Sequence, residues 1–403
     1  MNKNLTSVRG IKCWGAHTGI KSMRRDLAII YSEVPAATAA VYTQNEVAAE
    51  PIKLCRKHLK NNMAQVIVCN AGNANACTGK DGQKAAIAMA DAAAEMLDLN
   101  PEDVVVASTG LIGAPFPTDD IVSGIKENIP KLSKKAAAGS FAANAILTTD
   151  TFAKEGFVEF RADDYSINMA GIAKGSGMIH PNMATMLAFI VCDVAIDPKL
   201  LQDLTRECVD DTFNMITVDG DTSTNDMVVV MANGLAQNDE IKKKSDMGYK
   251  ALKKHLLELM THLAKLIVSD GEGASKFIEY EVDKAKSKST AKQLARKISD
   301  STLVKAAMFG RDPNWGRIVC AAGNAGVKFD YTKADLFIGS MEEEVQVLKS
   351  GKPVKFNRTA MKQRLRESHL KIRLVVNNGD EKAFAWGSDL TTDYVLFNSV
   401  YTT

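Results

Sequence analysis

The chain has 403 residues, of which 46% are hydrophobic and 24% are charged, and its formal net charge is +2. This composition is typical of a globular protein with a sizeable core, and the balanced charge argues against proteins that bind nucleic acid or anionic membranes. Because the sequence has no signal-like start and no run of about 18 apolar residues, we expect a cytoplasmic protein without membrane spans. The seven cysteines are scattered and form no C-x-x-C pair. This spacing predicts reduced thiols and neither a disulfide framework nor a zinc site.

In the first third of the chain, short β-branched runs alternate with turn residues. An Ala-rich helix is predicted over residues 81–99, with Asp81 as its N-cap. Strands are predicted in this part at residues 26–34, 36–44, 64–72 and 101–110.

The rest of the chain continues to mix the two kinds of element. Strands are predicted at residues 151–160, 165–175, 186–196, 226–234 and 276–282, and in the last sixty residues. Helices are predicted over residues 198–216, 248–268 and 289–309. The chain shows no internal repeat and no regular βαβ alternation. We therefore expect a mixed α/β (α+β) fold of layered sheets and helices.

The stretch KGSGMIHPNMATML (residues 174–187) gathers Gly, Ser, Lys and His ahead of an apolar run. It is not a P-loop, because Lys174 precedes the glycines, and it is not a nucleophile elbow, because glycines flank Ser176 directly. His180 either orients a substrate or is an ordinary loop residue. Elsewhere, His255 and His262 are expected to be surface or half-buried residues.

The acidic segment DGDTSTND (residues 219–226) is a second candidate motif, because it resembles a calcium-binding loop. An EF-hand loop needs glycine at its sixth position, where this segment has Thr224. A polar turn that leads into the next strand is the simpler interpretation, and no metal site is predicted.

Thr185 is the candidate nucleophile of the stretch. A threonine hydroxyl needs a neighbouring base, and an N-terminal threonine supplies one in its own α-amine, with a pKa of about 8. Ala184 is small and leaves its carbonyl open to attack, and the turn-rich approach favours a strained peptide. Taken alone, the same residues also fit an ordinary buried threonine at the start of a strand.

The stretch closely resembles the cleavage-site motif of the ornithine acetyltransferase (glutamate N-acetyltransferase) family of arginine biosynthesis. Several further blocks resemble this family and follow in its order. They are ASTGLIG (107–113), LTTDT (147–151), TFNMITVDGDTSTND (212–226), SDGEGASKFIE (269–279), GRDPNWGRI (310–318) and NSVYTT (398–403). Because the blocks are collinear over nearly the whole chain, the resemblance is far more specific than any single motif.

The resemblance implies self-cleavage between Ala184 and Thr185, within a self-cleaving fold of the ornithine acetyltransferase/aminopeptidase kind. An N-terminal (α) chain, 1–184, and a C-terminal (β) chain, 185–403, would then share one core. Thr185 would be the nucleophile that carries the acetyl group, and Thr109 and Gly110 would form the oxyanion hole. The implied substrate-binding residues are Thr148, Lys174, Thr185, Glu272, Asn398 and Thr403.

The reaction implied by the resemblance moves an acetyl group from N2-acetyl-L-ornithine to L-glutamate through acetyl-Thr185. We expect Glu272 to hold the ammonium group and Lys174 a carboxylate or the oxyanion region. The ester carries the acetyl group, so no cofactor is expected, while the use of acetyl-CoA as a second donor stays open. Family precedent implies a heterotetramer of two α and two β chains.

Two other functions are compatible with the residues alone. One is an N-terminal-nucleophile aminopeptidase or amidohydrolase of related fold, which would pass the acyl group to water. The other is an uncleaved α/β ligand-binding protein that uses the Gly-rich turn. Acceptor dependence distinguishes the first rival from a transferase, and chain scission distinguishes the second.

Overall fold

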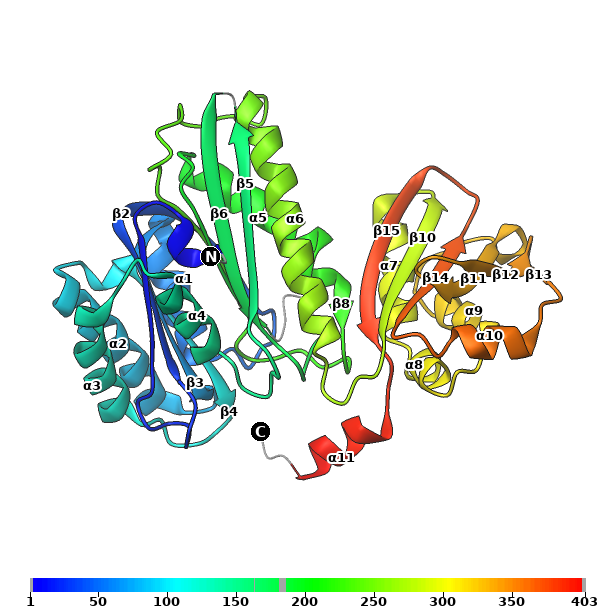
Figure 1. Ribbon diagram of the computed structural model, residues 1–403, viewed down its shortest axis with the longest axis horizontal. Coiled ribbons are helices and arrows are strands. Elements are labelled where there is room, and N and C mark those ends of the chain that lie inside the picture. Colours follow the sequence, from blue (N-terminus) through cyan, green and yellow to red (C-terminus); the bar gives the residue numbers. More distant parts are fainter. Residues whose placement is uncertain (1–2, 163, 181–185, 401–403) are drawn as a thin grey trace.

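Two mixed β-sheets covered by helices form the protein, shown in Figure 1 as a computed structural model that describes residues 3–162, 164–180 and 186–400. The first sheet contains β1 (Ile11–Ala16), β2 (Leu27–Tyr42), β3 (Met63–Asn73), β4 (Val104–Leu111), β5 (Lys154–Ala162), β6 (Tyr165–Lys174), β7 (Leu187–Cys192) and β9 (Met227–Ala232). The second contains β8 (Ile216–Thr217), β10 (Phe277–Ala285), β11 (Asp335–Ser340), β12 (Glu344–Lys349), β13 (Lys352–Pro353), β14 (His369–Val375) and β15 (Glu381–Ser388). The predicted mixed, layered architecture is confirmed.

The helices cover both sheets. They are α1 (Glu50–His58), α2 (Gly79–Leu97), α3 (Thr118–Asn128), α4 (Ala136–Ala145), α5 (Pro198–Asp211), α6 (Met247–Ser269), α7 (Lys288–Ser299), α8 (Thr302–Phe309), α9 (Trp315–Gly323), α10 (Arg358–Arg364) and α11 (Thr392–Val400). Helices α1–α4 pack on one face of the first sheet, and α5 and α6 pack on the other. Helix α7 packs on the second sheet. No helix of the described residues is both long and apolar enough to cross a bilayer.

The centre of the first sheet is buried on both faces. Its strand order is β4-β3-β2-β9-β7-β6-β5, with β1 beside one half of β2. In β7, Leu187 and Phe189 belong to the core beneath α1–α4, whereas Ala188 and Ile190 belong to the core beneath α5 and α6. Side chains alternate between the faces of a strand, so a strand covered on both faces needs apolar residues throughout. This is why the sequence runs LAFIVC without a polar break.

Strand β2 corrects one sequence prediction. The segments 26–34 and 36–44 were expected to be two strands, but they form one, and Pro35 lies inside it. The first half of β2 pairs with β1 as far as Ser32, and the second half pairs with β9 from Ala37 onward. Proline cannot donate a ladder hydrogen bond, so it is tolerated at this change of partner, where the pairing with β3 also shifts register.

Several helices begin or end at residues that differ from the sequence predictions. The helix predicted over 289–309 is interrupted, because Ser301 adopts an extended conformation and caps α8 through the Val304 N–H. The helix predicted over 198–216 ends at Asp211. Asp81 is not an N-cap but lies inside α2. The last sixty residues include two helices, α10 and α11, beside the predicted strands.

The predicted cleavage position lies between β6 and β7, and Ala184 and Thr185 themselves are outside the described residues. Strands β7 and β9, which follow this position, lie between β2 and β6, which precede it. The division into chains 1–184 and 185–403 stays a prediction. If it occurs, both pieces contribute adjacent strands to one sheet.

Candidate active site

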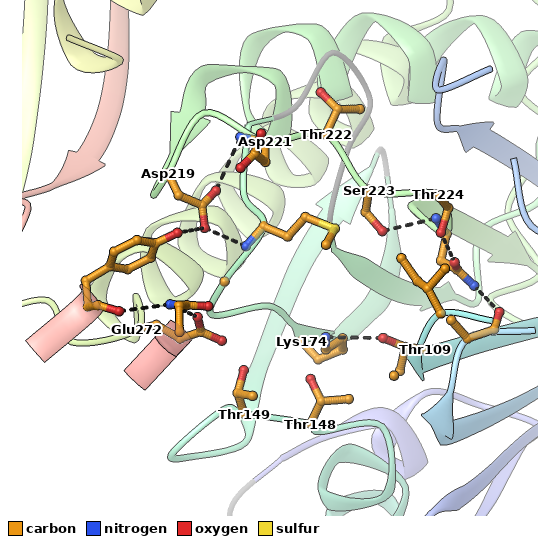
Figure 2. Close-up of a pocket in the computed structure, with 18 residues that line it drawn as sticks. Thr109, Thr148, Thr149, Lys174, Asp219, Asp221, Thr222, Ser223, Thr224 and Glu272 are labelled. Carbon is orange, nitrogen blue, oxygen red and sulfur yellow. Dashed lines mark hydrogen bonds between the residues drawn. The ribbon is translucent and has the colours of Figure 1, made fainter. Parts of the chain in front are cut away.

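A cavity of about 400 Å³ opens where β4 and β6 end, next to the loops that precede β9 and β10. Six of the nine predicted site residues line it, namely Thr109, Gly110, Thr148, Lys174, Glu272 and Asn398. The other three, Ala184, Thr185 and Thr403, lie outside the described residues. In the view of Figure 2, Asp219 and Glu272 lie at one end of the cavity and Thr109 and Thr224 at the other, with Lys174 between them.

The oxyanion-hole candidates lie at the end of β4. Thr109 is 8% exposed. Gly110 has φ +131°, and a Cβ atom at this position would lie 2.3 Å from the carbonyl carbon of Gly72 in the neighbouring β3. A side chain at residue 110 would therefore clash with backbone as well as strain its own φ angle. The close approach of β3 and β4 explains why the segment is rich in small residues.

Lys174 is the last residue of β6 and its side chain is buried. Its Nζ donates a hydrogen bond to the Thr109 Oγ1 at 3.3 Å. Lys174 also pairs across the sheet with Leu187, which follows the predicted nucleophile by two residues. The chain leaving the predicted cleavage position therefore enters the sheet beside Lys174.

A buried ionic cluster adjoins the cavity. Lys154 Nζ contacts the carboxylates of Asp150 at 2.7 Å and Asp270 at 2.6 Å, and all three side chains are nearly inaccessible. Asp150 also accepts hydrogen bonds from the Gly175 N–H at 2.7 Å and the Thr148 N–H at 3.0 Å. Burial alone would raise the pKa of Asp150, but the positive charges of Lys174 and Lys154 and these hydrogen bonds lower it to about 2. The cluster thus fixes the backbone on either side of the cavity.

Glu272 is at the opposite end, on the loop between α6 and β10. Asn398 of α11 donates a hydrogen bond to the Glu272 carboxylate at 3.1 Å. Burial raises the pKa of Glu272, hydrogen bonds from Thr149 and Asn398 oppose this, and the negative charge of Asp219 adds to it. A Cβ atom on Gly177 would lie 2.2 Å from a Glu272 carboxylate oxygen, so this glycine makes room for the acid.

Asp219 is a cavity residue that the sequence reasoning did not single out. Its carboxylate accepts hydrogen bonds from the Met178 N–H at 2.6 Å, the Ile179 N–H at 2.8 Å and the Tyr394 hydroxyl at 3.2 Å. Burial raises the pKa of Asp219 despite these hydrogen bonds. Asp219 thus ties the Gly-rich stretch to the C-terminal helix.

The segment 219–226, predicted to be a polar turn, contributes more than a turn, because Asp219 and residues 221–225 line the cavity. The sequence held a signal for this role, since the segment belongs to one of the family-like blocks. Its polar density alone did not indicate which cavity the residues would face.

The C-terminal helix α11 was predicted as part of a strand region. None of its residues is buried. It leaves the second sheet after β15 and runs back toward the first sheet, as Figure 1 shows. Its contacts to the site come from Tyr394, which reaches Asp219, and Asn398, which reaches Glu272.

The histidines do not line this cavity. His180 Nδ1 lies 3.3 Å from the Thr217 hydroxyl and 3.4 Å from the Asp300 carboxylate, in a separate small hollow beside α7. His255 stacks on Phe160, with ring centroids 4.6 Å apart. His262 is hydrogen-bonded at 3.3 Å to a backbone carbonyl in β5. The expectation that His255 and His262 are surface or half-buried residues is confirmed, because His255 is half-buried and His262 is exposed.

Comparison with known proteins gives one consistent family. The model of the ArgJ family matches residues 12–403. The arginine biosynthesis bifunctional protein ArgJ of Staphylococcus epidermidis is 48% identical over 401 residues, which cover 99% of this chain and 98% of that protein. ArgJ 1 of Clostridium acetobutylicum is 45% identical over 401 residues, with the same coverage of both. A crystal structure of ArgJ from Bacillus halodurans is 40% identical and covers 45% of this chain and 94% of its own, with a TM-score of 0.43.

Proposed function

The chain belongs to the ArgJ family, and on this premise we propose that it transfers the acetyl group of N2-acetyl-L-ornithine to L-glutamate in arginine biosynthesis. The observation that carries the proposal is the meeting of Thr109, Gly110, Lys174 and Glu272 in one cavity. This cavity combines a site for a developing oxyanion with a carboxylate that can bind an ammonium group.

Self-cleavage before Thr185 occurs once, before the first turnover, and exposes the α-amine of this residue. The amine takes the hydroxyl proton while Oγ attacks the acetyl carbonyl of the donor. The negative charge that develops on the carbonyl oxygen is stabilised by the Gly110 N–H and the Thr109 hydroxyl. The Lys174 ammonium supports this region, because its Nζ lies 3.3 Å from the Thr109 oxygen. The protonated α-amine returns its proton to the ornithine nitrogen as the amide C–N bond breaks, and ornithine leaves. Glutamate then enters, its amine attacks the acetyl ester, and the Thr185 hydroxyl is regenerated as the ester C–O bond breaks and the proton of the attacking amine passes to Oγ through the α-amine.

Donor and acceptor differ mainly at the side-chain end, where ornithine carries an ammonium group and glutamate a carboxylate. Glu272 suits the ammonium group, because it lies at the end of the cavity away from Thr109 and is half-buried. Charge pairing in a partly desolvated site is stronger than in water. Thr148 and Asn398 line the same cavity and contribute polar contacts, and Thr403 is assigned to substrate binding from the resemblance alone.

Three further features belong to the proposal. The acetyl ester carries the group, so the transfer itself needs no cofactor. Acetyl-CoA serves as a second donor, in keeping with the word bifunctional in the names of the relatives. The cleaved protein works in the cytoplasm as a heterotetramer of two α and two β chains.

Denaturing gel electrophoresis and mass spectrometry test the mechanism together. The wild-type protein should give two fragments, and Thr185→Ala should give one chain of 43.6 kDa. Donor without glutamate should make the C-terminal fragment heavier by one acetyl group. The matched control Thr332→Ala changes an exposed threonine outside the cavity and should behave like the wild type.

Steady-state kinetics then separate a transferase from a hydrolase. Turnover of acetylornithine should require glutamate and follow a ping-pong pattern. Release of acetate at the same rate without glutamate would show a hydrolase instead. Formation of N-acetylglutamate from acetyl-CoA and glutamate tests the second donor.

A further inference from the structure

Asn225 is a buried amide at the Thr109 end of the cavity, and the proposed transfer does not use it. It lies two residues before β9, lines the cavity and is 6% exposed. Its side-chain nitrogen donates hydrogen bonds to the backbone carbonyls of Ala74 at 2.6 Å and Ser108 at 2.8 Å. Both hydrogens of this nitrogen are therefore used by backbone. Asn225 thus acts on the protein chain rather than on a molecule in the cavity.

The oxygen of the same amide is held as well. The Thr224 hydroxyl donates a hydrogen bond to the Asn225 Oδ1 at 2.5 Å. Backbone carbonyls can only accept, so the amide nitrogen must face them and the oxygen must face the hydroxyl. In Figure 2, Thr224 lies at the same end of the cavity as Thr109. The network therefore fixes both the place and the orientation of the amide.

Contacts from a distant part of the chain anchor the segment that carries Asn225. The Ala49 N–H donates to the Thr224 carbonyl at 2.9 Å, and the Thr43 hydroxyl donates to the Ser223 carbonyl at 2.7 Å. Thr43 directly follows β2 and is fully buried. A buried polar network whose members are satisfied is rigid. The amide of Asn225 therefore extends from a fixed support.

The two carbonyls that Asn225 joins belong to neighbouring strands whose pairing becomes irregular at this point. Ala74 directly follows β3, and Ser108 lies in β4. The parallel register of the two strands is regular as far as Gly72 and shifts at Asn73. An irregular ladder leaves backbone groups without their regular partners. The side-chain amide supplies a cross-strand contact where the regular ladder stops.

The Ser108 carbonyl is one peptide group away from the oxyanion-hole candidates. It belongs to the planar peptide group that contains the Thr109 nitrogen. A rotation of this plane would carry the Thr109 side chain and the following Gly110 N–H out of their positions. It would also disturb Lys174, whose Nζ donates to the Thr109 Oγ1 at 3.3 Å. The contact from Asn225 to Ser108 therefore controls the geometry of this end of the cavity.

We propose that Asn225 is a positioning residue, which holds the Ser108–Thr109 peptide group and thereby fixes the oxyanion-hole donors before the substrate binds. The inference rests on the acetyl transfer proposed above and adds a residue to it. Donors that stabilise a transition state are effective when they need no rearrangement during the reaction. Asn225 meets this requirement, because its contacts are with the chain itself and do not depend on a bound substrate.

Steady-state kinetics of Asn225→Asp test the role. This variant keeps the shape of the side chain and an oxygen acceptor for the Thr224 hydroxyl, but its ionised form has neither N–H donor. It should lower kcat by about 10- to 100-fold, with little change in the KM for acetylornithine or glutamate. An unchanged kcat would overturn the positioning role, and a raised KM beside it would show a substrate contact instead.

Asn233→Asp is the matched control. Asn233 directly follows β9, is 8% exposed, and donates from its side-chain amide to the Arg9 carbonyl at 2.8 Å. It is thus another buried asparagine that bonds to backbone, but it does not line the cavity. Both variants should lower the thermal midpoint of unfolding, and only Asn225→Asp should lower kcat. An equal loss of kcat in both would show a general effect on stability and would contradict the proposal.

A double-mutant cycle shows whether Asn225 acts through the oxyanion hole. Thr109→Ala removes one assigned donor, and its effect on kcat is measured in the wild-type and the Asn225→Asp backgrounds. If Asn225 positions this donor, Thr109→Ala should cost clearly less in the second background, because the donor is already displaced there. Effects that simply multiply would overturn the assignment.

Circular dichroism and denaturing gels show whether Asn225→Asp folds and is cleaved. If it fails either test, Asn225→Gln replaces it, because glutamine keeps both N–H donors on a longer side chain. A folded and cleaved Asn225→Gln should have a kcat closer to the wild type than Asn225→Ala has, and equal values in these two variants would contradict the assignment. A wild-type protein without acetyl transfer would instead overturn the proposed function, and this inference with it.

Discussion

The Thr109 end of the cavity and the Glu272 end differ in what holds their side chains. Thr109 and Lys174 are buried near the ends of β4 and β6, and the ionic cluster of Asp150, Lys154 and Asp270 holds the N–H of Gly175, the residue after Lys174. Glu272 lies on a loop, and its partner Asn398 belongs to a helix with no buried residues. The first end is pre-organised by backbone pairing, and the second is held by side-chain contacts near the surface.

This difference suggests that the Thr109 end stabilises the transition state and the Glu272 end binds and releases the substrates. Transition-state stabilisation depends on donors that are fixed before the reaction begins. Substrate exchange, in which ornithine leaves and glutamate enters the same cavity, depends on contacts that form and break in every cycle. We therefore expect changes at the Thr109 end to lower kcat and changes at the Glu272 end to act mainly on KM.

The largest effect is expected at Gly110. Gly110→Ala puts a Cβ atom 2.3 Å from the Gly72 carbonyl carbon and displaces the N–H that we assign to the oxyanion hole. Steady-state assays should show kcat lowered by a factor of about 100 to 1000. Gly113→Ala is the matched control, because Gly113 also has a positive φ of +76° but has no atom near the added Cβ. If both variants lose activity equally, backbone strain and not the oxyanion hole explains the loss.

Changes in the ionic cluster of Asp150, Lys154 and Asp270 should lower the stability of the fold more directly than the kinetics. The Asp150 pKa of about 2, compared with 3.8 for the free side chain, corresponds to about 2 kcal/mol of folding free energy at pH 7. Because the folded-state pKa is lowered, this contribution is complete above pH 3.8 and is lost as the pH falls toward 2. Asp150→Asn should lower the thermal midpoint at pH 7, and the gap to the wild type should narrow between about pH 4 and pH 2. A pH-independent gap would show that packing and not charge is responsible.

Glu272 tests the other end of the cavity. Glu272→Gln should raise the KM for acetylornithine by roughly tenfold, because it removes the charge expected to pair with the ammonium group. The KM for glutamate should change less, and an equal change in both would contradict the assignment. Burial raises the pKa of Glu272 above 4.5, so the wild-type KM for acetylornithine should rise as the pH falls toward that raised value. The KM of the variant should lack this rise.

The smallest effect is expected at Gly177. A Cβ atom there would meet the flexible end of the Glu272 side chain, which can move aside. Gly177→Ala should therefore raise the KM for acetylornithine by a few-fold, about 1 kcal/mol, with little change in kcat. Gly323→Ala, where no atom lies within 4 Å of the added Cβ, should match the wild type. A loss in kcat at Gly177 would place Glu272 closer to the chemistry than we propose.

Segments that face the core could be predicted from the sequence, whereas changes of strand partner could not. Apolar runs such as LAFIVC and the long amphipathic pattern of α6 were assigned correctly, because core burial acts on the local sequence. Local patterns did not reveal that Pro35 lies within one continuous strand, since a change of strand partner is a tertiary event. The same holds for α11, whose sequence carries no clear amphipathic signal.

The sequence by itself determined the family and the mixed α/β class, because collinear motifs and apolar periodicity are local features of a sequence. The residues of the candidate site stay a prediction from the same motifs. Only the tertiary structure decided which of these residues share a cavity. The sequence singled out the segment that contains Asp219 but did not show what Asp219 or Tyr394 would contact, because their partners lie in segments distant in the chain. Pairing of β7 with β9 and the return of α11 create these contacts, and such long-range pairing depends on the packing of the whole sheet.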